Sequence, residues 1–161
     1  MLQKRHREAG RVVARTYHLG VGSRLINWVF ATLTKLGFGA SYRHILTVRG
    51  RKTGRVYSTP VDVMEIGGDR WLVAGYGVVN WVHNVRASGE ATLSRGGQSQ
   101  AYRVVEVGPA DAIPVLREYM RRVRVTAPYF DATADSSDEA VAAEVVRHPV
   151  FRLVPQAASD S

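Results

Sequence analysis

The sequence predicts an α+β fold, a small antiparallel β-barrel with N-terminal helices and further helices along its flanks. Two observations lead to this fold class. Short runs rich in β-branched and aromatic residues are separated by glycine-rich turns, as in strands that are joined by hairpins. Segments with apolar residues at helical spacing precede the strands and interrupt them. Five or six strands are expected, and the candidates are His44–Val48, Val56–Ile66, Trp71–Ala74, Ala91–Ser94, Ala101–Val107 and Val150–Val154.

Turns and helices fill the intervals between these strands. Gly67-Gly68-Asp69 and Gly96-Gly97 predict two hairpin turns. Helices are expected at Trp81–Ala87, from Pro109 to about Val125, and at Ser137–Val146, with a polar loop over Pro128–Ser137. Alternation in the second strand is imperfect, because Asp62 and Met64 share a parity with Ile66. This pattern fits a strand that curves, or one that is buried on both sides.

The length of 161 residues and the mass of 17.8 kDa correspond to one ordinary domain. We divide the chain into a basic helical leader (1–39), the barrel domain (40–154) and a loose tail (155–161). Helices are expected within the leader over residues 5–18 and 23–37. The most apolar stretch, Leu25–Phe38, is too short and too polar to span a bilayer, which takes about 20 apolar residues.

Composition excludes several classes of function. The chain has no cysteine, so it has no disulfide framework, no thiolate metal site and no cysteine nucleophile. The five histidines are too scattered to predict a metal site, and none is expected. The motifs of serine hydrolases, zinc proteases and P-loop enzymes are missing. Gly20-Val-Gly22 lacks the third glycine of the dinucleotide fingerprint and follows no strand, which excludes a Rossmann site.

Positive charge is concentrated in the first part of the chain. Residues 1–60 hold twelve basic groups against one acidic group, a net of +11, whereas the whole chain has a net of +8. This asymmetry points to an anionic partner, which could be nucleic acid, a membrane surface or a phosphorylated or polycarboxylate ligand. The alternative is a solvated basic face that aids solubility.

The sharpest local feature is the segment Gly50-Arg51-Lys52-Thr53-Gly54, which leaves a predicted strand. Its two glycines permit positive φ angles and a close approach of the backbone to a ligand. Two cations, a hydroxyl and exposed amides between them are donors suited to a phosphate or a carboxylate. The alternative is a hairpin tip with solvated cations.

A second feature lies in the predicted helix after the third strand. Trp81, Asn84 and Arg86 can lie along one side of that helix. The indole offers a flat surface for a planar ring, and the amide offers a donor and an acceptor. The alternative places Trp81 in the core and uses Asn84 to cap a neighbouring loop.

Taken in order, these motifs resemble the deazaflavin-dependent nitroreductase family. The resemblance covers about residues 40–154 and includes Gly50–Gly54, Thr59-Pro60, Trp81, Asn84, Arg86-Ala87 and the closing His148–Phe151. It implies a split β-barrel of the FMN-binding-like type that uses the 8-hydroxy-5-deazaflavin coenzyme F420. It further implies an oxidoreductase that transfers a hydride from the reduced coenzyme to a small electrophile, such as an activated alkene, a quinone or a nitro compound.

The resemblance also implies roles for individual residues. Arg51, Lys52 and Thr53 would bind the phosphate and the acidic tail of the coenzyme. The deazaflavin or its linker would be lined by Tyr57, Ser58, Thr59, Pro60, Ala74, Gly75 and Tyr76, with Trp81, Val82 and Asn84 completing the pocket. Tyr129 would border the substrate, and either Tyr76 or Tyr129 would donate a hydrogen bond or a proton to the product.

Two segments depart from the family pattern. The loop Gly75–Asn80 is shorter than expected, and Gly75 stands where the family often has a serine. The stretch from Tyr129 to His148 is longer than usual and acidic. Both segments border the expected active site, so the cofactor is easier to assign than the acceptor.

Two alternatives to this function stay open at this point. An FMN-dependent oxidoreductase is the first, because flavin enzymes share this type of barrel. A basic nucleic-acid-binding module is the second, encouraged by a pI of about 10.3. Nucleic-acid binding is not expected, because only Tyr17 and Trp28 accompany the cations of the leader and no recognition motif is present.

No secretory signal is evident, so a cytoplasmic protein is expected. The leader also suggests peripheral contact with the anionic inner face of the membrane, because five cations precede an apolar helix: Lys4, Arg5, Arg7, Arg11 and Arg15. The alternative is that this helix packs on the barrel and the cations are solvated. The sequence does not predict the oligomeric state.

Overall fold

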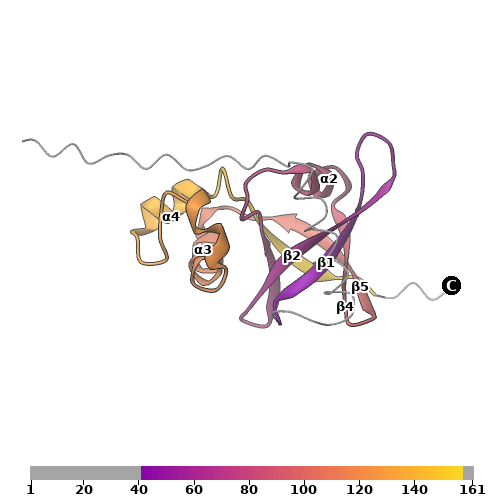
Figure 1. The fold of residues 1–161 in the computed structure, drawn as a ribbon, viewed down its shortest axis with the longest axis horizontal. Helices are drawn as coiled ribbons and strands as arrows, with labels where there is room; N and C mark the ends of the chain where they lie inside the picture. The colour runs from indigo at the N-terminus through magenta and orange to yellow at the C-terminus, as the bar shows by residue number, and fades with distance from the viewer. Residues whose placement is uncertain (1–40, 158–161) are drawn as a thin grey trace, which may run out of the picture.

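The computed structural model describes residues 41–157, and this part of the chain forms a closed six-stranded antiparallel barrel with helices at one end and along one side (Figure 1). The strands are β1 (Arg43–Arg49), β2 (Val56–Ile66), β3 (Asp69–Val73), β4 (Glu90–Arg95), β5 (Gln98–Glu106) and β6 (Val150–Pro155). The helices are α2 (Asn80–Ser88), α3 (Pro109–Arg122), the 3-10 helix η1 (Arg124–Tyr129) and α4 (Asp138–Glu144).

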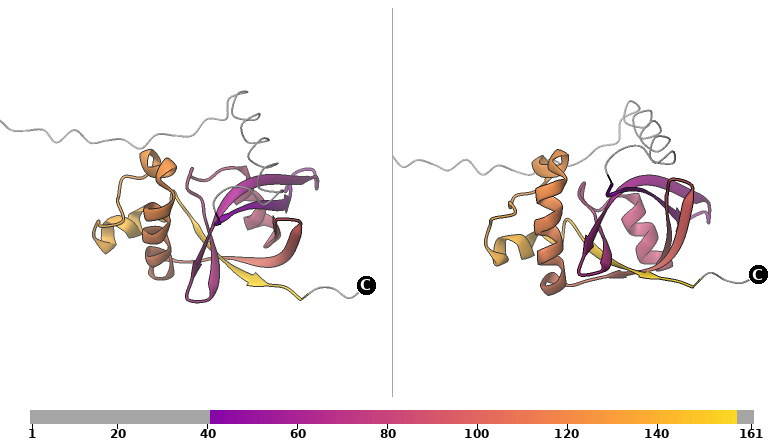
Figure 2. Two further views of the ribbon diagram at one scale, coloured as in Figure 1. Left: turned by 60° about the horizontal axis from the view of Figure 1, so that its bottom comes forward. Right: turned by 90° about the horizontal axis from the view of Figure 1, so that it is seen from below.

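The strands close in the order β1-β2-β3-β6-β5-β4, and β1 pairs with β4 to complete the barrel (Figure 2). Tight hairpins join β2 to β3 and β4 to β5. The glycines at the first of these turns, Gly67 and Gly68, have φ angles of 62° and 83°. This left-handed conformation is accessible to glycine without steric cost, which explains the turn residues. Antiparallel pairing throughout confirms the predicted fold class.

The barrel interior and α2 form one hydrophobic core. Inward-facing residues of every strand belong to one cluster with Val82 and Val85 of α2, and Val82 has no exposed surface. The helix therefore closes one end of the barrel rather than lying on its outside. Because α2 belongs to the core, the residues at its surface are held in a fixed position relative to β1 and β2.

A second core lies outside the barrel, beneath α3. It contains Met64 of β2, Val73 of β3 and the buried face of α3, including Leu116 and Tyr119. Met64 is fully buried although it points away from the barrel interior. The imperfect alternation of β2 thus arises because both faces of its C-terminal half are covered.

Most element boundaries differ from the sequence-based expectation by one to three residues, and two of these differences have an identified local cause. The helix predicted to reach about Val125 ends at Arg122, and a 3-10 turn follows it. Thr126 donates its hydroxyl to the carbonyl of Val123, which stabilises this change of helix type. At the C-terminus, β6 extends to Pro155, and the amide of Gln156 donates to the carbonyl of Ala101.

The helical leader and its contact with a membrane fall outside the described residues and stay predictions. In the described part of the chain, the helices are too short or too polar to cross a bilayer.

Candidate functional site

The segment between β1 and β2 folds back on itself to present its cations. The Gly50 amide donates to the Arg55 carbonyl at 2.7 Å, and the Gly54 amide donates to the Gly50 carbonyl at 2.9 Å. A Cβ atom at Gly50 would lie 2.5 Å from the Tyr57 ring, so a larger residue would displace that ring. Close packing over Gly50 therefore requires glycine at the base of the loop.

Arg51 connects this loop to α2. The backbone amide and the guanidinium of Arg51 both donate to Oδ1 of Asn84, at 3.2 and 2.9 Å. Asn84 is only 5% exposed, and its side chain is oriented by the helix that closes the barrel. The two motifs that the sequence analysis described separately thus form one constellation. Asn84 caps the neighbouring loop, which is the alternative role weighed for it.

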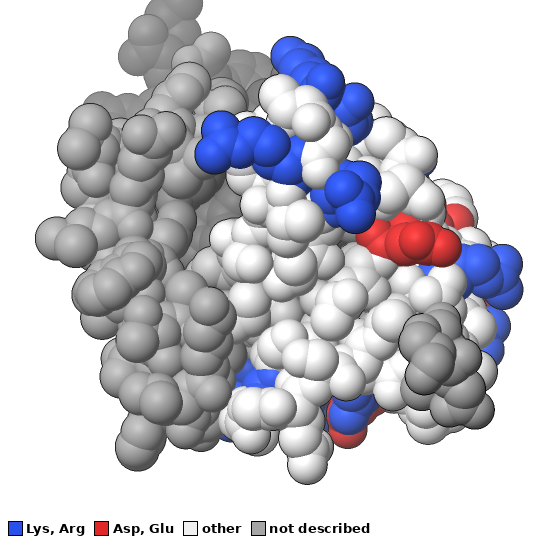
Figure 3. Space-filling model, turned by 90° about the vertical axis from the view of Figure 1, so that its right-hand side faces the viewer, with Lys and Arg blue, Asp and Glu red and all other residues white. Residues whose placement is uncertain are grey.

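The cations around this loop, Arg49, Arg51, Lys52 and Arg55, have no ion-pair partner among residues 41–157. Elsewhere on the barrel, in contrast, Arg86 pairs with Glu106 and Arg152 with Asp69. Lysine and arginine side chains gather near this end of the β1–β2 hairpin (Figure 3). Uncompensated positive charge on an ordered loop suits an anionic group with several acceptor oxygens.

The four residues Tyr57 to Pro60 do not share one surface. Tyr57 and Thr59 have the parity of the inward-facing Val61, whereas Ser58 and Pro60 point to the other face of the sheet. The Ser58 and Thr47 hydroxyls lie 2.9 Å apart on that exposed face. A single planar ligand therefore cannot contact all four side chains.

Trp81 and Val82 are packing residues in this structure. The Trp81 ring is partly buried against the barrel core and lies edge-on to Phe151, with ring centroids 5.7 Å apart. Val82 is fully buried and presents no surface to a ligand. Of the two, only Trp81 has exposed surface that a bound ring could contact.

A second group of residues surrounds the loop that leads from β3 to α2. Ala74 and Gly75 are buried, whereas Tyr76 is 38% exposed. The Tyr76 ring packs edge-on against Tyr129 of η1, with ring centroids 5.2 Å apart and planes 71° apart. The two tyrosines predicted as hydrogen-bond donors are therefore in contact, although 53 positions separate them in the sequence.

Tyr119 and His148 also belong to this group, and the sequence analysis assigned a role to neither. His148 contacts the backbone carbonyls of Ala74 and Tyr129 through its two ring nitrogens. A Cβ atom at Gly75 would lie 2.0 Å from the Tyr119 hydroxyl, so the phenol occupies the space of a side chain at that position. Burial raises the pKa of Tyr119 well above its ordinary value, which keeps the phenol neutral. Apart from the position of Gly75 itself, no local sequence signal indicates this contact.

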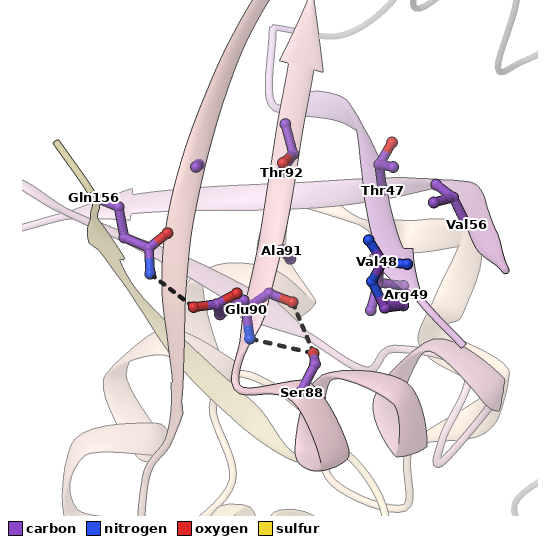
Figure 4. Close-up of a pocket in the computed structure, with 10 residues that line it drawn as sticks. Thr47, Val48, Arg49, Val56, Ser88, Glu90, Ala91, Thr92 and Gln156 are labelled. Carbon is purple, nitrogen blue, oxygen red and sulfur yellow. Dashed lines mark hydrogen bonds between the residues drawn. The ribbon is translucent and has the colours of Figure 1, made fainter. Parts of the chain in front are cut away.

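A surface pocket of about 270 Å³ adjoins the base of the basic loop (Figure 4). Arg49 and Val56, which flank the loop, line one side of it, and Ser88, Glu90 and Thr92 line the other. The lining thus holds one guanidinium and one carboxylate, which do not form an ion pair with each other. No group of three or more potential metal ligands occurs among the residues that the structure describes.

Comparison with protein families gives one match. The model of the family described as F420H2-dependent quinone reductase matches residues 31–148, which is more than half of the chain. No curated protein matches the chain significantly.

Solved structures with a similar fold share little sequence with the chain. One, described as a domain-swapped dimer, has a TM-score of 0.54 and 17% identity, over 82% of this chain and 98% of the other. Protein Atu2129 of Agrobacterium tumefaciens has a TM-score of 0.53 and 13% identity, over 89% of this chain and 60% of the other. A heme binding protein from Mycobacterium smegmatis has a TM-score of 0.51 and 13% identity, over 78% of this chain and 51% of the other. These likenesses concern the fold alone and agree with the predicted split barrel.

Proposed function

Because the chain belongs to the F420H2-dependent quinone reductase family, we propose that its basic loop binds coenzyme F420 and that its physiological acceptor is a quinone or a related small electrophile. Membership of this family makes the protein an F420-dependent reductase. The coenzyme supplies the hydride when it is bound, and the chain supplies binding and orientation.

The observation that carries the proposal is the set of cations without carboxylate partners among residues 41–157. The guanidinium of Arg51 is held by Asn84, so little side-chain entropy is lost when an anion binds to it. Lys52 is exposed and adds a second positive charge beside it. These donors fit a ligand that carries a phosphate and a carboxylate tail.

The tyrosine pair is proposed to form the acceptor side of the site. Reduction of a quinone or an activated alkene requires a proton as well as a hydride, and a phenol can donate a hydrogen bond to the oxygen that becomes charged. Tyr76 is the more exposed of the two rings and is the first candidate for this donor. Tyr129 would then limit the space that is open to the acceptor.

The experiment is a fluorescence titration of the purified full-length protein with oxidised F420 and, separately, with FMN. We expect saturable binding of F420 and much weaker binding of FMN, which lacks the carboxylate tail. Turnover is then measured with reduced F420 and a series of quinones, activated alkenes and nitroaromatic compounds. Tight FMN binding without F420 binding would contradict the proposed cofactor. Turnover of none of these acceptors by the protein with reduced F420 bound would contradict the proposed acceptor.

A further inference from the structure

His148 lies between the two segments that carry the candidate tyrosines. Its Nδ1 is 2.9 Å from the carbonyl oxygen of Ala74, two residues before Tyr76. Its Nε2 is 2.9 Å from the carbonyl oxygen of Tyr129. One buried ring thus contacts the backbone of both segments, and the Tyr76 and Tyr129 rings that these segments carry contact each other.

The ring itself is held firmly. It stacks on Phe130 with ring centroids 3.8 Å apart and planes 19° apart. The backbone amide of His148 donates to the carbonyl of Glu144 at 2.7 Å, which fixes the main chain at this position. Next in the chain, the Pro149 carbonyl accepts the amide of Ala74 at 3.0 Å. The contacts of the two ring nitrogens therefore constrain how the two segments lie relative to each other.

We infer that His148 is a positioning residue that joins the Ala74–Tyr76 segment to η1 and thereby holds Tyr76 against Tyr129. The inference rests on the proposed function, which assigns these two tyrosines to the acceptor side. In the protein without coenzyme, the contacts of His148 are thus expected to determine how the Tyr76 and Tyr129 rings lie against each other. It follows that His148 affects the reaction of the bound acceptor more strongly than the affinity for the coenzyme, whose anionic part is assigned to the basic loop.

The number of donors on the ring makes this link depend on pH. Both partners are carbonyl oxygens, which only accept, and a neutral imidazole has a single N–H donor. Protonation supplies the second donor and allows both segments to be held at once. Burial lowers the pKa of His148, and Arg147 acts in the same direction, whereas the two carbonyls and Glu144 raise it. The link therefore becomes bidentate as the pH falls.

The charged and titratable groups around the ring come from the neighbouring elements. The Glu144 carboxylate lies 3.7 Å from Nε2 and is also paired with Arg147, which in turn pairs with Asp131. The phenols on the adjoining segments are those of Tyr76, Tyr119 and Tyr129.

The test is NMR spectroscopy of the full-length protein without coenzyme, with labelled histidine and tyrosine rings. Tyr76→Phe and Tyr129→Phe assign the two tyrosine signals. In the wild type, both signals are expected to shift together with the titration of the His148 imidazole. Tyrosine signals that do not follow the His148 titration would overturn the inference, and this result does not depend on the folding of any His148 variant.

Two substitutions give an independent readout. His148→Phe keeps the stacking on Phe130 and removes both nitrogen contacts, whereas His148→Gln keeps a donor. We expect His148→Phe to lower kcat by about tenfold or more, the effect of one lost hydrogen bond, with partial recovery in His148→Gln and a smaller change in the Kd for oxidised F420. Equal losses in Kd and kcat, or no loss in either, would overturn the inference. Failure of the wild type to bind F420 would instead contradict the proposed function, and the NMR result would stand.

Discussion

Gly75 lies at a point of the site where there is no room for a side chain. The residue itself is buried, and its missing side chain is replaced in space by the hydroxyl of Tyr119. Since Tyr119 lies in the core beneath α3, it cannot move aside without disturbing that core. At Gly75, the loop from Ala74 to Tyr76 is therefore coupled to the outer core by this close contact.

Gly75→Ala is expected to destabilise the protein by about 1–3 kcal/mol, the usual cost of overpacking a core. The measurement is urea denaturation. Gly108→Ala is the comparison, because nothing lies within 4 Å of a Cβ atom at Gly108, and its expected loss is only the smaller cost of alanine at the N-cap of α3. An equal change in both variants would show that the Tyr119 contact is not the cause. Tyr119→Phe should restore part of the stability of Gly75→Ala, because it removes the nearest atom.

Helix α2 joins the two halves of the site. Its first residue follows the loop that carries Tyr76, and Asn84 in its middle accepts both donors of Arg51. Val82 and Val85 pack in the barrel core and hold the helix in place. The contact of Asn84 with Arg51 therefore fixes the basic loop relative to the core. The loop is thus an ordered part of the barrel although all its side chains between Gly50 and Val56 are exposed.

Asn84→Ala should release the basic loop without removing a positive charge. We expect the affinity for F420 to fall by about tenfold, because one hydrogen bond to a charged group contributes roughly 1.5–3 kcal/mol. Hydrogen exchange of the amides in residues 50–55 should increase at the same time. Asn84→Asp keeps an acceptor for Arg51 and should preserve the order of the loop. Faster exchange with unchanged affinity would show that order in the loop does not contribute to binding.

Elements whose signals are local were predicted well from the sequence. The strands follow from β-rich runs and glycine turns, and six of them are present in the described part of the chain. The end of α3 was misplaced, because it depends on a hydrogen bond of Thr126 and not on a helix-breaking residue. The basic loop was recognisable as a motif. Its contact with Asn84 spans 33 positions, and the contact of His148 with Ala74 spans 74, so neither pairing could be deduced from local sequence patterns.

For the molecule as a whole, two buried histidines predict a loss of stability in mild acid. Burial lowers the pKa of His44 and of His148 below the ordinary histidine value of about 6.5. The unfolded chain therefore binds protons at these sites more readily than the folded protein, and the free energy of unfolding falls as the pH drops below about 6.5. Asp62 acts in the opposite direction, because burial raises its pKa.

Urea denaturation at pH 7.5 and at pH 5.5 measures this effect. Comparison with the variant His44→Gln/His148→Gln isolates the two histidines, since Asp62 is common to both proteins. We expect the wild type to lose more stability than the variant between the two pH values. The same loss in both proteins would assign the pH dependence to other groups.

The central claim is that the ordered cations of the β1–β2 loop bind the anionic part of coenzyme F420. The most direct measurement is the Kd for oxidised F420 in Arg51→Ala/Lys52→Ala, with Arg121→Ala/Arg122→Ala as control. The control removes the same charge from exposed side chains at the end of α3, on the other side of the barrel (Figure 1). We expect the first variant to bind at least about tenfold more weakly, because charge-assisted contacts contribute roughly 1.5–3 kcal/mol each, and the control to bind as the wild type does. Equal Kd values in the folded loop variant and the wild type would contradict the claim.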